Sequence, residues 1–344
     1  MSHLSLSSMR QFLYSSISSI NQNKLNGMIA EIDLRNTLND LGFSKRISPG
    51  GWIVRNVGPE VFGHHTSVFF PETIKAGEEY PENRNFEEPP RALHTICATM
   101  HQIGIHSYYC IPVVIRDDDY TSVKWYSTQL GIPSQDSYHP FPENLKNYGE
   151  RTRNYNFLRY KSDSSMIPEV AVPEEFSKEH IRVHFQNKFM CEMSDIDAIF
   201  WGEQYTYPIE IKEKTAAEDK QIGEYFEIEI EPFVSNAEIF SRRGNQESIF
   251  FIREVEENKI KIKSKWWFTT LNKIRKDLNR IGDQICNLKF KRKHAAIKIS
   301  KDFFVPLNRN QLTNLLKTRY THFSFIVRSL IPHLCKIFIV STIS

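Results

Sequence analysis

The sequence predicts an α/β protein in which a mixed β-sheet is flanked by helices and extended by a large N-terminal region. Its 344 residues are 40% hydrophobic and 12% aromatic, enough to bury a sizeable core in one large domain or two modest ones. Apolar residues recur at helical spacing in some segments and alternate with polar residues in others. Gly and Pro separate these segments, as expected of turns.

In the first half, Leu25 to Leu41 has helical spacing, and Gly42 is placed to end that helix. A second helix is expected to begin near Leu93. The expected strands are Trp52–Val57, after a turn at Pro49–Gly51, and Ile105–Ile115. Two polar stretches with scattered Pro and Gly, 71–90 and 117–165, are expected to form loops and short elements.

The second half shows a more regular pattern. Helices are expected over 233–243 and, with a basic surface, over 271–285. The expected strands are Ile181–Phe185, Ile196–Phe200, Tyr207–Lys212, Ser248–Val255 and Lys259–Lys263. We therefore divide the chain into an N-terminal helical and mixed region, 1–165, and a core with a basic C-terminal part, 166–344.

Charge is distributed unevenly along the chain. The formal net charge is only +3, but residues 251–344 hold 20 Lys and Arg against 6 Asp and Glu, whereas residues 1–250 hold 24 against 35. An acidic N-terminal part and a basic C-terminal part favour a polyanionic partner for the C-terminal part. Solvated surface helices would give the same composition.

Cysteine usage and hydropathy indicate a cytoplasmic protein outside the membrane. The five cysteines are widely spaced, odd in number and form no CxxC pair, so a disulfide framework is not expected. The Ser-rich start lacks the apolar run of a secretory signal. Arg328, Pro332, His333 and Lys336 interrupt the apolar stretch 323–340, which we expect to be a buried helix or strand.

The segment most informative about function runs from Asp197 to Lys212. An apolar strand that contains Asp197 is followed by a short turn and then by Glu210-Ile211-Lys212. Side chains alternate across a strand, so Glu210 and Lys212 share one face while Ile211 takes the other. If the two strands pair as a hairpin, Asp197, Glu210 and Lys212 lie on one face.

Two carboxylates and a lysine in this arrangement suit phosphodiester hydrolysis. Carboxylates supply the hard oxygen ligands that Mg²⁺ prefers. The metal polarises the phosphoryl oxygen and acidifies a bound water. A neighbouring lysine orients or deprotonates that water, and it offsets the cost of burying the two acids. A solvated hairpin with paired surface charges is the alternative.

On these residues the sequence resembles the PD-(D/E)XK nuclease superfamily, which includes most type II restriction endonucleases. The resemblance covers about residues 185–255, and no Pro precedes Asp197. It implies a restriction-endonuclease-like core with its active site where the two central strands diverge. It also implies Mg²⁺ held by Asp197, Glu210 and the backbone carbonyl of Ile211, with Lys212 as the third catalytic residue.

Other residues are also candidates for the metal site. Asp195 has the same strand parity as Asp197 and is an alternative ligand, and Glu31 on the first helix is a further candidate. Histidines and cysteines between His94 and Cys110 raise a zinc hypothesis, but their spacing fits no common zinc motif and semi-buried fillers explain them equally well.

The expected function is site-specific cleavage of double-stranded DNA, as in restriction-modification, leaving 5′-phosphate and 3′-hydroxyl ends. The nuclease core is expected within 166–344, and the chain exceeds such a core, so residues 1–165 are expected to serve DNA recognition and dimerisation. A homodimer suits cutting of both strands of a palindrome. Alternating lysines from Lys259 to Lys265, followed by Trp266 and Trp267, are expected either to contact phosphates or to protect an edge strand. A structure-selective repair nuclease and a non-catalytic DNA-binding protein stay open as alternatives.

Overall fold

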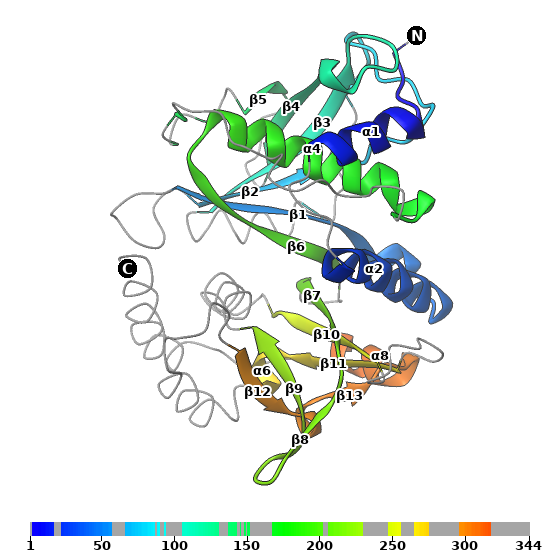
Figure 1. Ribbon diagram of the computed structural model, residues 1–344, viewed down its shortest axis with the longest axis vertical. Helices are drawn as coiled ribbons and strands as arrows, with labels where there is room; N and C mark the ends of the chain where they lie inside the picture. The colour runs from blue at the N-terminus through cyan, green and yellow to red at the C-terminus, as the bar shows by residue number, and fades with distance from the viewer. Residues whose placement is uncertain are drawn as a thin grey trace. The chain divides into compact units, whose positions relative to one another are not determined.

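The computed structural model shows a mixed α/β protein (Figure 1). It describes residues 2–16, 22–56, 66–86, 88–89, 93, 105–130, 137–142, 145, 148, 150–151, 167–201, 206–229, 247–255, 265–274 and 296–317. The chain divides into two compact units. The first comprises Met1–Ile32 and Pro49–Ile196, and the second Asp33–Ser48 and Asp197–Ser344. Both units are therefore discontinuous, whereas the sequence suggested a single division at residue 165.

The first unit contains a mixed sheet in the order β6-β1-β2-β3-β4-β5. Its strands are β1 (Ile47–Asn56), β2 (Thr66–Pro71), β3 (His106–Val114), β4 (Val123–Leu130), β5 (His139–Phe141) and the first part of β6 (Cys191–Trp201). The β2–β3 pair is parallel, and β1–β2, β3–β4 and β4–β5 are antiparallel. This sheet confirms the strand expected at Ile105–Ile115. It also adds an eight-residue strand, β4, to a stretch expected to hold only loops and short elements.

Helices α1 (Leu6–Ser16) and α4 (Val172–Lys188) lie over one face of this sheet (Figure 1). Large side chains of α4, among them Phe176, Ile181 and Phe185, pack into one core with alternate strand residues such as Phe69 and Trp125. The strand expected at Ile181–Phe185 is therefore wrong. Alternation of Ile, Val and Phe over five residues matches a strand, but Ile181 and Phe185 also lie one helical turn apart.

The turn expected at Pro49–Gly51 is also wrong, because all three residues belong to β1. Gly51 is required there by close packing. A Cβ at position 51 would lie 2.5 Å from the Phe69 carbonyl oxygen and 2.7 Å from the Phe70 ring. The glycine therefore marks a close approach between neighbouring strands rather than a bend.

The second unit contains a mixed sheet in the order β13-β11-β10-β7-β6 and a small sheet in the order β12-β9-β8. The β7–β10 pair is parallel, and β6–β7, β10–β11 and β11–β13 are antiparallel. The additional strands are β7 (Thr206–Lys214), β8 (Ala217–Asp219), β9 (Gly223–Glu229), β10 (Ile249–Glu254), β11 (Lys265–Thr270), β12 (Ala296–Ser300) and β13 (Val305–Pro306).

The described helices that complete this unit are the end of α2 (Gln22–Asp40), α6 (Leu271–Ile274) and α8 (Arg309–Lys317). The described three-residue 3-10 helices are η1 (Ser44–Arg46), η2 (Tyr120–Ser122), η4 (Glu169–Ala171) and η6 (Lys301–Phe303). An apolar cluster joins the two sheets, with Phe226 and Ile228 of β9 packed against Phe250 and Ile252 of β10. This cluster orders the β7–β10 region from one face.

Several predictions are confirmed: the first helix (α2, with Gly42 after it at φ +86°) and the strands at Ile196–Phe200, Tyr207–Lys212 and Ser248–Val255. The strand expected at Trp52–Val57 is confirmed as far as Asn56, and Val57 lies outside the described residues. The helix at 233–243, the strand at Lys259–Lys263, most of the helix that follows Leu93 and the apolar stretch 323–340 lie outside the described residues. Within the described ranges, no helix combines the length and apolar character needed to cross a membrane.

A buried histidine connects α4 to the sheet of the first unit. The Trp125 indole N–H donates to Nδ1 of His180 at 3.0 Å, and Nε2 of His180 donates to the Tyr120 carbonyl at 3.1 Å. Burial, with His184 nearby, lowers the pKa of His180 to about 3. The ring is therefore neutral at physiological pH and acts as a structural bridge.

This bridge predicts a pH-dependent stability. The folded pKa lies below the ordinary value of 6.5, so the stabilising contribution is complete above pH 6.5 and is lost as pH falls toward 3, by up to about 1.4 kcal/mol per pH unit. His180→Phe leaves the Trp125 N–H without its acceptor and should destabilise the protein by about 1–3 kcal/mol at pH 7.5. Urea unfolding of both proteins should show this gap narrowing toward pH 5, and a constant gap would contradict the assignment.

Candidate active site on strands β6 and β7

Strands β6 and β7 form the antiparallel pair expected from the sequence, but they pair over only part of their length. The ladder joins Ala198–Trp201 to Thr206–Ile209, with Ala198 opposite Ile209. Asp197 and Glu210 are the next residues along this register. From there β7 continues to Lys214 beside β10. The two expected acids therefore stand where the β6–β7 ladder ends.

The Asp197 carboxylate bridges the two strands at this point. Its Oδ2 accepts a hydrogen bond from the Ile211 backbone N–H at 2.6 Å. Ile211 is buried, and an amide left unpaired there would cost free energy. The side chain of Asp197 thus replaces a backbone acceptor for β7 and is held beside the Glu210-Ile211-Lys212 segment.

Glu210 and Lys212 form an ion pair on the same face of β7. Lys212 Nζ lies 2.8 Å from Glu210 Oε1, and the Glu210 side chain is only 8% exposed, against 24% for Lys212. In the parallel register they stand beside Phe250 and Ile252, which belong to the apolar cluster. Exclusion of water on that side strengthens the pair and raises the cost of leaving Glu210 without a cation.

The reverse face of β7 carries a second charged network. Arg253 of β10, with its side chain 8% exposed, lies 3.1 Å from Asp33 of α2 and 3.3 Å from Glu213 of β7. The Trp266 indole N–H of β11 also donates to Asp33, at 3.2 Å. Arg253 is thus held between carboxylates from a helix and from the strand that carries Lys212.

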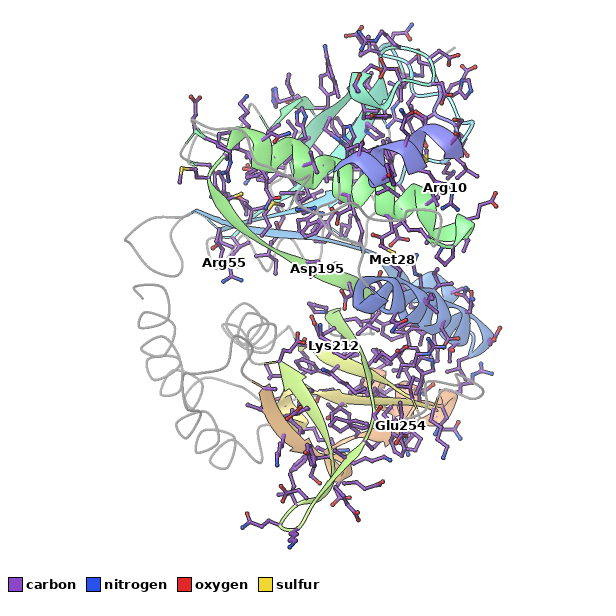
Figure 2. The ribbon with its side chains drawn as sticks, in the orientation of Figure 1. Arg10, Met28, Arg55, Asp195, Lys212 and Glu254 are labelled. Carbon is purple, nitrogen blue, oxygen red and sulfur yellow. The ribbon has the colours of Figure 1, made fainter. Side chains whose placement is uncertain are left out.

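Another ionic cluster lies at the end of β10 on the Lys212 face. Glu254 accepts hydrogen bonds from the Trp267 indole N–H at 2.6 Å and from Lys301 Nζ at 2.7 Å. Figure 2 labels Lys212 on β7 and Glu254 on β10. Of the lysines at 259–265 that were expected to follow a strand, only Lys265 is described; it is exposed and stands opposite Glu254 at the start of β11.

The remaining candidates belong to the first unit or have other environments. Asp195 is an exposed residue of β6. Glu31 lies 3.3 Å from Lys178 of α4, with both side chains largely buried, which gives it a structural counter-ion. Cys110 is fully buried in the core, where burial raises the pKa of its thiol. The histidines and cysteine at 94–101 lie outside the described residues.

The donor set on β6 and β7 suits a hard divalent cation. Among the described residues, no group of three or more His, Cys, Asp or Glu side chains is arranged to hold a metal ion. The expected site requires less, namely the two carboxylates of Asp197 and Glu210 and the carbonyl of Ile211. Mg²⁺ accepts such a set because it retains several waters and takes few protein ligands.

Two features of this unit were missed in the sequence. Asp33, Glu213 and Arg253 are far apart in the sequence; the β7–β10 register brings Glu213 to Arg253, and the packing of α2 brings Asp33 to the same side chain. Glu247 precedes β10 and accepts a hydrogen bond from the Asn272 backbone N–H at 3.0 Å; burial raises its pKa to about 7. A charged residue beside a strand gave no signal that it would be buried.

Comparison with protein-family models, curated proteins and solved structures found no match to this chain.

The Asp197–Ile211 contact predicts different effects for two substitutions. Asp197→Ala removes the acceptor of a buried amide and should destabilise the second unit by about 1–3 kcal/mol. Asp197→Asn retains a side-chain oxygen for that N–H and should cost much less. Urea unfolding followed by tryptophan fluorescence measures both, and equal losses for the two variants would show that the contact does not stabilise β7.

Proposed function

We propose that this protein is a Mg²⁺-dependent DNA endonuclease of the PD-(D/E)XK type. The observation that carries the proposal is the convergence of Asp197, Glu210 and Lys212 at the end of the β6–β7 ladder, with Glu210 and Lys212 paired at 2.8 Å. The sequence resembles the PD-(D/E)XK superfamily, and this resemblance implies that the catalytic residues lie where two central strands diverge. The mixed sheet with a parallel β7–β10 pair is compatible with that core.

Each residue has a defined role in this proposal. Asp197 and Glu210, with the Ile211 carbonyl, would hold the cation, which polarises the scissile phosphate and acidifies a bound water. Lys212 would orient the attacking water or take its proton, and it would stabilise negative charge developing on the phosphate. The Ile211 N–H fixes one oxygen of Asp197, and the rigid β7–β10 ladder fixes the positions of Glu210 and Lys212.

Double-stranded DNA cut at a specific short sequence is the proposed substrate, with 5′-phosphate and 3′-hydroxyl products. The basic C-terminal part of the chain, residues 251–344, supplies positive charge for the phosphate backbone. A chain longer than a catalytic core needs leaves residues for base recognition. We propose a cytoplasmic homodimer, because two symmetry-related sites suit a palindromic target.

Digestion of plasmid and phage DNA with Mg²⁺, with and without chelator, tests this proposal. Discrete fragments that require the metal are expected from the wild type. Lys212→Met should lower the cleavage rate by about 10²- to 10⁴-fold. Glu210→Gln should also abolish most cleavage, because it removes a charged ligand while conserving the shape of the side chain. Asp197→Asn should do the same without the loss of stability expected of alanine.

A matched control is available in the same unit. Lys298 of β12 lies 2.8 Å from Asp219, so Lys298→Met also removes a lysine from an acid–lysine pair. Its cleavage should match that of the wild type. Equal cleavage by Lys212→Met and the wild type would refute the assignment. Cleavage confined to branched DNA would indicate a repair nuclease, and salt-sensitive binding with no Mg²⁺-dependent product would indicate a DNA-binding protein.

A further inference from the structure

The strand segment that carries Glu210 and Lys212 has an unusual ladder environment. Strand β7 pairs with β6 only as far as Ile209, and among the described strands its partner over Glu210–Lys214 is β10. On the β6 side, the Ile211 N–H of this segment donates to Asp197 Oδ2 at 2.6 Å. The backbone ladder that continues through Glu210–Lys214 is the one with β10, so attachment to β10 contributes to the position of this segment.

Three charged side chains from β7, β10 and α2 meet at this point. Glu213 follows Lys212 directly and stands opposite Arg253 in the parallel register, 3.3 Å from its Nη1. Asp33 of α2 lies on the other side of Arg253, at 3.1 Å from its Nε. Asp33 also accepts from the Trp266 indole, and Trp266 is the partner of Arg253 across the β10–β11 ladder. The network thus ties α2, β7, β10 and β11 together.

We infer that Arg253, Glu213 and Asp33 form a clamp that positions Lys212 and Glu210 for the reaction. The clamp acts from the reverse face of β7, so its members are positioning residues that need not touch the substrate. The expected effect of the clamp on catalysis rests on the proposed function. The attachment of β7 to β10 by the clamp does not. Loss of Glu213 leaves the backbone ladder without its side-chain tie to Arg253 immediately next to Lys212. A small displacement there removes the alignment on which catalysis depends.

A purely structural ion pair is the competing explanation, and the first unit supplies a matched control. Arg84 contacts Glu72 at 2.7 Å, with side chains 17% and 26% exposed, against 8% and 14% for Arg253 and Glu213. Glu72→Ala therefore removes the carboxylate of a comparable Arg–Glu pair that does not involve β7. Any general effect of losing such a pair should appear equally in Glu72→Ala and Glu213→Ala.

Amide hydrogen exchange of the full-length protein and steady-state cleavage kinetics test the clamp together. In Glu213→Ala, amides of residues 210–214 should exchange about tenfold faster or more, with little change in Glu72→Ala. In DNA titrations at saturating Mg²⁺, the kcat of Glu213→Ala should fall by about 10- to 100-fold while its KM for DNA stays nearly constant. Glu213→Gln keeps an acceptor for Arg253, so its exchange rates and its kcat should lie between those of Glu213→Ala and the wild type. If Glu213→Ala does not fold, Asp33→Asn replaces it, because asparagine can still accept from Trp266.

The outcomes separate the clamp from the proposed function. Unchanged exchange at residues 210–214 overturns the clamp, whatever the activity. Faster exchange with an unchanged kcat overturns the positioning role and leaves a structural ion pair. If the wild type cleaves no DNA, the proposed function fails and the positioning role fails with it, while the exchange data still decide whether the network holds β7.

Discussion

The candidate site depends on the point at which β6 and β7 stop pairing. Up to Ile209, backbone hydrogen bonds hold β7 on the β6 side, and beyond it the Asp197 carboxylate serves the Ile211 amide instead. The end of the ladder leaves the buried Ile211 amide without a backbone acceptor from the β6 ladder, and the Asp197 carboxylate supplies that acceptor. The same bond holds Asp197 beside Glu210 and Lys212.

The burial of Glu210 explains why a lysine lies beside it. The carboxylate borders the apolar cluster shared by β9, β10 and β12, where an isolated charge would be costly. Lys212 offsets that cost from two residues further along the strand. In the proposed function, the same closeness places the lysine beside the metal ligand Glu210. Stability and chemistry thus favour the same alternating Glu-x-Lys pattern, which is why the pattern alone does not distinguish a catalytic strand from a structural one.

Much of the local structure could be predicted because its causes are local. Helix α2 has helical spacing and a terminal glycine, and β7 alternates apolar and charged residues. Prediction failed where distant segments decide the outcome. Ile181–Phe185 is helical because its apolar face packs on a sheet built from residues 47–141, and Gly51 lies within a strand because of the Phe69 carbonyl. The discontinuous units likewise follow from long-range packing.

The same distinction explains which parts of the candidate site were found. Asp197, Glu210 and Lys212 lie within 16 positions, so strand alternation and one hairpin are enough to place them on one face. The Arg253 network draws on α2, β7 and β10, and only the parallel β7–β10 register brings Glu213 to Arg253. A parallel pair requires a long crossover connection, and no local pattern sets its register. Charged residues that are brought together by such a register are therefore recognised only when the fold is known. In this chain they include the residues that we infer to position Glu210 and Lys212.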